Sequence, residues 1–419
     1  MARIVVYAMA YRGDVYPYVP IASELARRGH AVVFVVPREF HGDMAAEPFR
    51  CAHSGTDFGP GALDRRAAYV DRWGNRLGGA LLLRLYFGEF TVPHLDALYA
   101  AVDAEVARAD LLISHPAASL VGAMAAERRG VPWLVGDLFP TLVPSEHAPV
   151  GGLPYLGRRP TRALLRAARS RLLDPVTVAA PFRAYRHRLG LPVPDGWNVI
   201  DARLSPHANV ALVPSAYTPP APDWPQPYRL VGFTPWSGPG GGALDAEVER
   251  YLDGGDPPVV VTLGTSAASA RPEVFDQALD ALDRLGGRAI VLASNDAQAG
   301  RLSARGGGHL VRRFVPLAPL LPRSAAIVHS GAHGTNSLAL LAGVPSVVVP
   351  CLFDQVAHAR RQEALGTGVH VRRRRPLAPA LGRVLGDDAM RARAQEFAAL
   401  IAHEDGTTAT ADEAERMVA

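Results

Sequence analysis

The sequence contains no lysine, and all 44 of its basic residues are arginine. This absence excludes enzymes that need a Schiff-base lysine, and it excludes phosphate-binding loops that end in Gly-Lys. Cysteine is nearly absent too, since only Cys51 and Cys351 occur in 419 residues. Two cysteines so far apart fit no metal-ligand spacing and suit a reducing compartment. We therefore expect a cytoplasmic protein that holds no metal.

Long apolar runs are also missing. No stretch reaches about 18 apolar residues, and the N-terminus lacks a basic region followed by an apolar core, so we expect neither secretion nor membrane insertion. Residues 151–190 hold nine arginines and one acid, Asp174. Such a segment can lie on an anionic membrane surface or form a solvated helix face, and we expect the second. The sequence is also rich in Ala, Gly and Pro, so we attribute the many arginines to its overall composition and not to nucleic-acid binding. We therefore expect no nucleic-acid partner.

The length predicts two domains, because 419 residues are more than one hydrophobic core usually serves. Eight prolines occur between residues 214 and 239, and three glycines follow them. We expect no regular element in such a segment. The predicted organisation is an N-terminal domain over 1–213, a linker over 214–245, a C-terminal domain over 246–386 and C-terminal helices over 387–419.

Strands and helices alternate in the first half, which predicts a parallel sheet. Residues 4–8 and 31–36 have the composition of buried strands, and residues 17–26 have the periodicity of an amphipathic helix. The turn after the first strand contains Asp14 and no GxGxxG motif, which argues against dinucleotide binding there. Asp14 is either the N-terminal acid of the next helix or an acid facing a ligand crevice at the strand ends.

Residues 325–366 form the most informative stretch. The sequence predicts a buried strand, a small-residue turn, a helix and a second strand, over residues 325–329, 330–334, 335–342 and 346–350. The N-terminus of such a helix presents unpaired N–H groups and a partial positive charge, so it can bind a diphosphate without a metal or a lysine. A glycine turn of this kind also occurs simply to close a doubly wound sheet.

The motif His329-x-Gly331-Ala332-x-Gly334-Thr335, followed by Gly343-Val344-Pro345, Pro350 and Asp354-Gln355, resembles the donor signature of the GT-B nucleotide-sugar glycosyltransferases. These include macrolide, glycopeptide, sterol and plant small-molecule enzymes. Near the N-terminus, Arg12-Gly13-Asp14-Val15-Tyr16-Pro17 resembles the Arg-Gly-Asp-x-x-Pro of the glycopeptide and sterol branches. The resemblance spans nearly the whole chain. It implies an α/β fold of two Rossmann-like doubly wound domains that face a cleft.

The resemblance also implies an activity: metal-independent, inverting transfer of a sugar from a UDP- or dTDP-sugar to an apolar or aromatic small molecule, without a cofactor. Asp14 is then the base that deprotonates the acceptor. Histidine-type relatives have an aspartate near the position of His115, so the two residues are expected to form one pair with exchanged roles. From its sequence context alone, His115 is equally a capping or core histidine. Asp137 and Phe139, which follow a later strand, are candidates for the acceptor pocket.

In the second half, the resemblance places the nucleotide and the sugar. The expected nucleotide contacts are Thr265, Ser266, Phe314, Val315, His329, Gly331, Ala332, Gly334 and Thr335. Phe314 either stacks on the base, with the Val315 backbone at the base edge, or belongs to the core. Asp354 and Gln355 are expected to orient the sugar. Leu317, Ser337 and His358 depart from residues that are common in relatives, so contacts to ribose and sugar do not transfer as a set.

Two other functions remain open. A non-catalytic homologue could activate a separate transferase, although the presence of Asp14, Asp354 and Gln355 argues against it. A nucleotide-sugar epimerase of the same fold would need more acids around the donor site than the sequence has. We expect a monomer or a homodimer, and the first of the C-terminal helices is expected to cross back to the N-terminal domain, as it does in relatives.

Overall fold

The computed structural model describes residues 1–9, 11–57, 84, 87–140, 143–148, 155–170, 178–239, 242–264, 267, 271–351, 354–372 and 375–419. These residues form two compact units. The first unit contains described residues up to Thr234 together with Glu404–Ala419, and the second contains those of Pro235–His403. Among the described residues, no helix has the length and apolar character that a membrane span requires.

The first unit is built on a parallel sheet of seven described strands in the order β3-β2-β1-β4-β5-β6-β7. Their bounds are β1 Arg3–Tyr7, β2 Ala31–Val36, β3 Arg50–His53, β4 Leu111–Ser114, β5 Trp133–Asp137, β6 Ala208–Ala211 and β7 Tyr228–Leu230. The central strands β4, β5 and β6 are buried along their whole length and are mostly apolar, as expected for a sheet covered on both faces. Strand order reverses between β1 and β4, and such a switch point is where open α/β sheets bind ligands.

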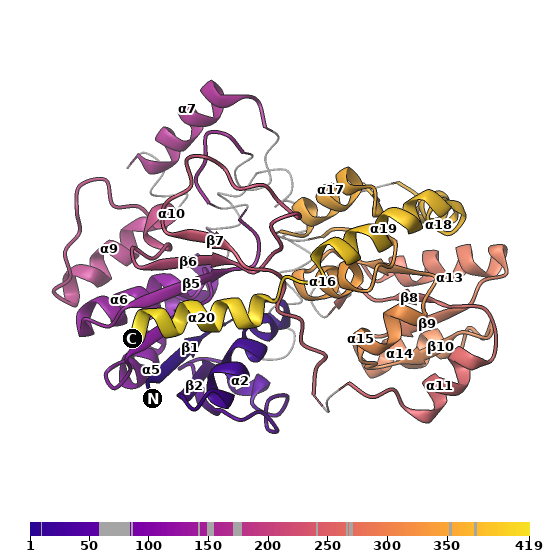
Figure 1. Ribbon diagram of the computed structural model, residues 1–419, viewed down its shortest axis with the longest axis horizontal. Coiled ribbons are helices and arrows are strands. Elements are labelled where there is room, and N and C mark those ends of the chain that lie inside the picture. The colour runs from indigo at the N-terminus through magenta and orange to yellow at the C-terminus, as the bar shows by residue number, and fades with distance from the viewer. Residues whose placement is uncertain are drawn as a thin grey trace. The chain divides into compact units, whose positions relative to one another are not determined.

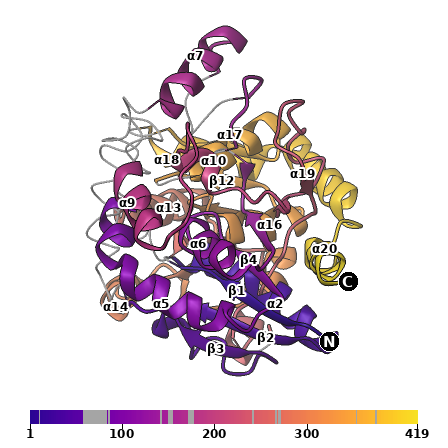
Figure 2. The same cartoon turned by 90° about the vertical axis from the view of Figure 1, so that its left-hand side faces the viewer.

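Helices cover this sheet, and Figure 2 shows several of them around the strands. The α-helices of the first unit are α1 Arg12–Val15, α2 Val19–Arg27, α5 Leu95–Val106, α6 Ser119–Arg129, α7 Arg158–Arg169, α9 Ala179–Arg188, α10 Val199–Ala202 and α20 Gly406–Val418. Shorter turns lie at η1 Tyr16–Tyr18, η2 Arg38–Phe40, η3 Phe87–Thr91 and η4 Val92–His94. On α2, Val19, Ala22 and Leu25 are buried, as the helical periodicity predicted.

The second unit has its own parallel sheet, with six described strands in the order β10-β9-β8-β11-β12-β13. The bounds are β8 Val259–Val261, β9 Ala289–Leu292, β10 Leu310–Arg312, β11 Ala326–His329, β12 Ser346–Val348 and β13 Gly368–His370. The switch point of this sheet lies between β8 and β11. A core that includes Val260, Ile290 and Ile327 packs the sheet against its helices.

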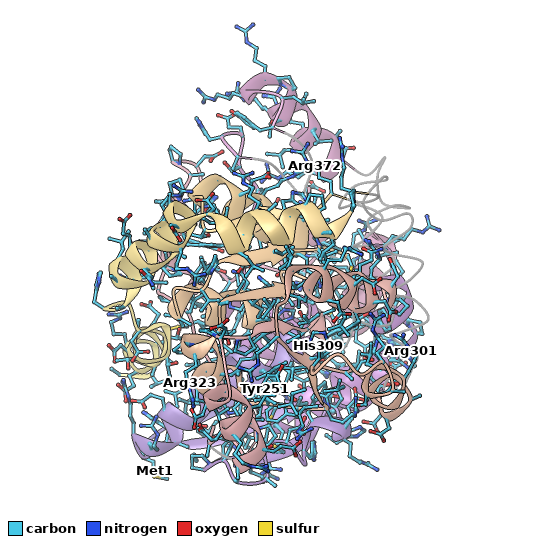
Figure 3. The ribbon with its side chains drawn as sticks, turned by 90° about the vertical axis from the view of Figure 1, so that its right-hand side faces the viewer. Met1, Tyr251, Arg301, His309, Arg323 and Arg372 are labelled. Atoms are coloured by element: carbon cyan, nitrogen blue, oxygen red, sulfur yellow. The ribbon has the colours of Figure 1, made fainter. Side chains whose placement is uncertain are left out.

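The helices of the second unit are α11 Ala246–Asp253, α13 Glu273–Leu285, α14 Asp296–Ser303, α15 Leu317–Leu320, α16 His333–Leu341, α17 Gln355–Leu365, α18 Leu377–Gly386 and α19 Asp388–Ile401, with the turn η7 Leu321–Arg323. Figure 3 shows the side of this unit that carries Tyr251, Arg301, His309 and Arg323. The Tyr251 hydroxyl donates to the carbonyls of Ala289 and Gly308, which ties α11 to the β9–β10 edge.

Two features of the predicted organisation are corrected by the structure. The N-terminal domain was expected to end at residue 213 and the proline-rich linker to contain no regular element, but β7 follows β6 and pairs with it in parallel. Tyr228–Leu230 contains no proline, so its N–H groups can join a sheet edge although prolines precede it. The first unit therefore extends to Thr234.

The second correction concerns the C-terminus. The helix over 387–402 was expected to join the N-terminal domain, but α19 belongs to the second unit, where it packs on α16. It is α20 that joins the first unit and packs on α2 (Figure 1). Arg28 contacts Asp412 and Glu415 of α20 at 2.7 and 2.8 Å. A Cβ on Gly406 would lie 2.2 Å from the Gly232 carbonyl oxygen, so glycine allows the two backbones to approach closely.

Candidate active site

Asp14 lies in α1, directly after β1. Its Oδ2 accepts a hydrogen bond of 3.1 Å from the Tyr11 N–H, so one carboxylate oxygen caps the short helix. Its Oδ1 lies 3.5 Å from His115 Nε2. Asp14 can therefore be both the N-terminal acid of the helix and an acid facing the ligand crevice, because its two carboxylate oxygens have different neighbours.

His115 directly follows β4, the strand next to β1. Its backbone N–H donates to the Tyr7 carbonyl at 3.0 Å, which continues the ladder and fixes the histidine at the switch point. Nδ1 of the buried ring accepts from the Ala117 N–H at 3.2 Å. We infer from this hydrogen bond that neutral His115 carries its proton on Nε2, which is the nitrogen that faces Asp14.

Tyr18 links this pair to the next strand of the sheet. The edge of its fully buried ring meets His115, with 5.9 Å between ring centroids, and its hydroxyl donates to the Gly136 carbonyl. Burial, with the negative charges of Asp137 and Asp14, raises the pKa of Tyr18 well above its ordinary value. A Cβ on Gly136 would lie 2.9 Å from the Tyr18 ring, so a glycine in β5 makes room for it.

The polar end of β5 is buried among other polar side chains. Asp137 is buried, and its Oδ2 accepts from the Tyr228 hydroxyl at 3.1 Å. Arg203 is also buried and interacts electrostatically with Asp137 and Tyr228. Neither of its terminal nitrogens has a hydrogen-bond partner among the described residues. Phe139 is half-buried and packs edge-on against Tyr217. Asp137 thus belongs to a buried polar cluster.

In the second unit, His329 occupies the last position of β11, beside β8 at the switch point. Its side chain is completely buried, and Nδ1 accepts from the Gly331 N–H at 3.1 Å. Neutral His329 therefore carries its proton on Nε2, which has no partner among the described residues. Burial, and to a smaller extent His358, lowers its pKa to about 3, so the ring is neutral at physiological pH.

The turn after His329 leads into α16. Gly331 has φ +84°, and a Cβ there would lie 2.9 Å from Val348 Cγ1 and 3.0 Å from the Gln355 carbonyl oxygen. This glycine therefore lets the turn approach the start of α17. The helix begins at His333, two residues earlier than predicted, with Ala332 at the N-cap. Gly334 lies in its first turn, where a Cβ would meet nothing within 4 Å.

Asp354 and Gln355 stand at the start of α17. The Gln355 side chain is buried and its Oε1 accepts from the Cys351 N–H at 2.9 Å. The Asp354 side chain is 27% exposed, and its Oδ2 lies 3.3 Å from His358 Nε2. Burial raises the pKa of Asp354, but the contacts with His358 and His333 lower this pKa by more than burial raises it. The net shift of the pKa is therefore downward. Asp354 is thus ionised near neutral pH.

Comparisons with known proteins show which enzymes the chain is similar to. Residues 276–417 match the family described as "Erythromycin biosynthesis protein CIII-like, C-terminal domain". Over 423 residues the chain is 29% identical to O-mycaminosyltylonolide 6-deoxyallosyltransferase from Streptomyces fradiae, covering 96% of this chain and 94% of that protein. It is 29% identical over 375 residues to dTDP-epi-vancosaminyltransferase from Amycolatopsis orientalis, covering 88% and 85%.

Solved structures of glycosyltransferases have the same fold as this chain. Glycosyltransferase VinC in complex with dTDP superposes with a TM-score of 0.73 at 21% identity, with 99% of each chain covered. The calicheamicin glycosyltransferase CalG4 gives 0.72 at 19% identity, with 100% of this chain and 98% of CalG4 covered. The chain is a GT-B glycosyltransferase. The expected fold class, two Rossmann-like parallel-sheet domains, is thereby confirmed.

Two nucleotide-site candidates of this glycosyltransferase are clearly placed. The Phe314 side chain is 51% exposed, so the alternative that it is a core residue is wrong. Gly238 approaches its ring so closely that a Cβ would lie 2.6 Å from Cζ. Val315 is buried in the core of the second unit and has only its backbone to offer a ligand. Thr265 and Ser266 lie outside the described residues.

Several residues that contact the predicted site residues or their neighbours could not be found from the sequence: Tyr18, Arg203, Tyr228 and His333. Each is chemically ordinary in its local sequence, and its role depends on a partner far away in the chain. One local signal did exist, because an isolated glycine in a strand, Gly136, indicates that another group approaches closely.

One group of described residues in the glycosyltransferase has the geometry to hold a metal ion, Glu146, His147 and Asp223. Its carboxylates already have partners. Glu146 pairs with Arg158 and Arg162, and Asp223 accepts from the Ser145 hydroxyl and the Glu146 N–H, both at 2.7 Å. We therefore assign this group a structural role, in which it anchors α7.

Proposed function

We propose that this glycosyltransferase moves a sugar from a dTDP- or UDP-sugar to a hydroxyl group of an apolar or aromatic natural product, with inversion and without a metal ion. The pair formed by Asp14 and His115 at the first switch point carries the proposal, because it is a base with a defined partner where such folds bind ligands. Among the nucleotides we favour dTDP, since VinC was crystallised with dTDP and the Amycolatopsis relative is named for a dTDP-sugar.

In the proposed reaction, Asp14 Oδ1 takes the proton of the acceptor hydroxyl. The acceptor oxygen forms a bond to the anomeric carbon, and the bond from that carbon to the diphosphate oxygen breaks. Nucleoside diphosphate leaves with the electron pair. In-line attack of this kind inverts the anomeric centre.

His115 is proposed to position Asp14 rather than to accept the proton. Neutral His115 already carries a proton on Nε2, and protonating Nδ1 would break its bond from the Ala117 N–H. The ring therefore acts as a hydrogen-bond donor that orients Oδ1.

The leaving diphosphate is proposed to bind at the start of α16. His329 supplies a neutral N–H donor there, and the first N–H groups of the helix have no intrahelical acceptor. A positive helix end and fixed donors stabilise the charge that develops on the diphosphate, which is the task that metal ions perform in other transferases. Asp354 and Gln355 are proposed to orient the sugar.

The two cysteines of the glycosyltransferase are free and Cys351 is buried, which suits a reducing compartment. We propose that the enzyme works in the cytoplasm.

Nucleotide binding tests the donor assignment directly. Thermal unfolding with dTDP, UDP and ADP should show the largest stabilisation with dTDP, and His329→Ala should remove most of it because a buried donor is lost. His403→Ala, an exposed histidine of the same unit, is the control and should respond like the wild type. Equal responses of His329→Ala and wild type would contradict the assignment.

The same preparations separate the alternative functions. Incubation with dTDP-glucose and no acceptor should leave the sugar unchanged, whereas an epimerase would convert it. A non-catalytic partner protein would bind nucleotide but release no dTDP with any acceptor.

A further inference from the structure

A continuous line of polar side chains joins α16 to α17 inside the second unit. It runs from Gln362 through Asn336 and His358 to Asp354. The first three side chains are completely buried, and only the terminal carboxylate reaches solvent. Burying so many polar groups is costly unless each is satisfied, so their arrangement is informative.

The distances define the sequence of contacts. Gln362 Nε2 donates to Asn336 Oδ1 at 3.0 Å, and Asn336 Nδ2 lies 3.3 Å from His358 Nδ1. His358 Nε2 then lies 3.3 Å from Asp354 Oδ2. At the far end, the Thr367 hydroxyl lies 3.2 Å from Gln362 Oε1. Three of these contacts are hydrogen bonds, whereas His358 Nε2 faces Asp354 at ion-pair distance without an aligned hydrogen bond.

The carboxylate at the exposed end fixes the direction of the line. An ionised carboxylate 3.3 Å away disfavours a nitrogen lone pair pointing at it, so we infer that His358 Nε2 carries a proton. A neutral His358 then has a bare Nδ1, which requires the Asn336 amide to donate to it. The Asn336 oxygen can consequently accept only from the Gln362 amide, as the structure shows. The downward pKa shift of Asp354 agrees with an ionised end.

The alternative is a doubly protonated His358, which would reverse the Asn336 and Gln362 amides. It would place a positive charge in the interior next to His333, whose ring centroid is 5.7 Å from that of His358. Isolated buried charges are strongly disfavoured, so the neutral arrangement is favoured despite the nearby carboxylate.

We propose that Asn336 and Gln362 are positioning residues, which hold His358 as the Nε2–H tautomer and thereby present Asp354 as a fixed acceptor for a donor-sugar hydroxyl. This inference rests on the proposed function of Asp354. It also defines the substrate class, because an acceptor-only carboxylate selects a sugar with a free hydroxyl at the contacted position.

The tautomer can be measured without any substrate. In ¹⁵N-labelled protein at neutral pH, the His358 ring should show a protonated Nε2 and a bare Nδ1, with its signals assigned by their loss in His358→Gln. A wild-type His358 protonated on Nδ1, or on both nitrogens, would overturn the proposal.

Gln362→Leu tests whether the line transmits direction. Leucine offers no donor to Asn336 Oδ1, so the Asn336 amide is no longer held in one orientation and His358 protonated on Nδ1 should appear in the ¹⁵N spectrum. Gln277→Leu, an exposed position on α13, is the matched control and should leave the His358 signals unchanged. Unchanged His358 signals in a folded Gln362→Leu protein would also overturn the proposal.

Binding measurements connect the line to the sugar. His358→Phe should weaken dTDP-glucose binding on the order of 10-fold or more, which is typical for a lost hydrogen bond to a charged group. His358→Gln keeps an N–H near Nε2 and should recover part of this loss, while both variants bind dTDP like the wild type. Equal losses for dTDP and dTDP-glucose would indicate a merely structural role. If wild type bound neither ligand, the proposed function would fail, and the ¹⁵N spectra would still decide the tautomer.

Discussion

At the scale of single residues, protonation states follow from backbone hydrogen bonds. His115 and His329 each stand at a strand end, and each accepts an N–H from two residues further along the chain, Ala117 and Gly331. Both rings are therefore set to present an Nε2–H group. The sequence located both histidines, but it did not reveal their tautomers, which depend on the turn that follows each strand.

The neutral state of His329 predicts a pH dependence of stability. Its pKa is about 3 in the folded protein and about 6.5 when unfolded. Between these values the unfolded chain binds a proton that the folded protein excludes, so this contribution to stability is full above pH 6.5 and declines as the pH falls. The limiting slope is about 1.4 kcal/mol per pH unit.

Urea unfolding of wild type and His329→Gln between pH 7 and pH 5 checks this expectation. The wild type should lose more stability over the range than the variant, because glutamine does not titrate and other groups contribute to both proteins. Identical pH profiles would show that His329 is not buried in its neutral form.

At the scale of elements, two glycines three residues apart in the donor turn have opposite structural demands. Gly331 has a positive φ and no room for a Cβ, whereas Gly334 has open space around it. The sequence predicted ligand contacts at both glycines. It could not show that Gly331 packs against Val348 and Gln355, because these two residues come from distant parts of the chain. The structure separates a glycine needed by the fold from one that leaves room for a ligand.

Alanine substitutions should therefore behave differently. Gly331→Ala should lower the free energy of unfolding, through strain and a clash with the Gln355 backbone. Gly334→Ala should keep or slightly raise stability, because alanine favours helix by up to about 1 kcal/mol, yet weaken dTDP binding by filling the space above the helix start. Chemical denaturation and calorimetric titration measure the two quantities. Full dTDP affinity in Gly334→Ala would show that no phosphate approaches there.

At the scale of the whole molecule, the alternation of strands and helices predicted a parallel sheet, and the resemblance of two local motifs to GT-B glycosyltransferases implied the fold class and the pairing of Asp14 with His115. This worked because the carboxyl ends of neighbouring parallel strands meet at one edge. Local patterns gave wrong predictions where a short segment contacts an element elsewhere in the chain. Strand β7 pairs with β6, and helix α20 packs on α2. They also missed buried polar partners such as Asn336 and Gln362, because hydrophobic periodicity says nothing about which polar groups will meet.

The account also predicts how the enzyme responds to chelation. Because the start of α16 and His329 are proposed to stabilise the diphosphate, initial rates should be unchanged after exhaustive treatment with EDTA. Rates with added magnesium or manganese serve as the comparison. Activity that disappears with EDTA and returns with either ion would show that a cation supplies the missing charge.

The central claim, that Asp14 is the base of an acceptor-dependent sugar transfer, is tested most directly by the rate of glycoside formation in Asp14→Asn. Wild type, Asp14→Asn and the exposed control Asp195→Asn are mixed with dTDP-glucose and a panel of hydroxylated aromatic and macrocyclic compounds, and the glycoside is quantified by mass spectrometry. We predict that Asp14→Asn forms almost none, while it binds dTDP-glucose within a few-fold of wild type and Asp195→Asn keeps full activity. Glycoside formation by Asp14→Asn at the wild-type rate would contradict the account.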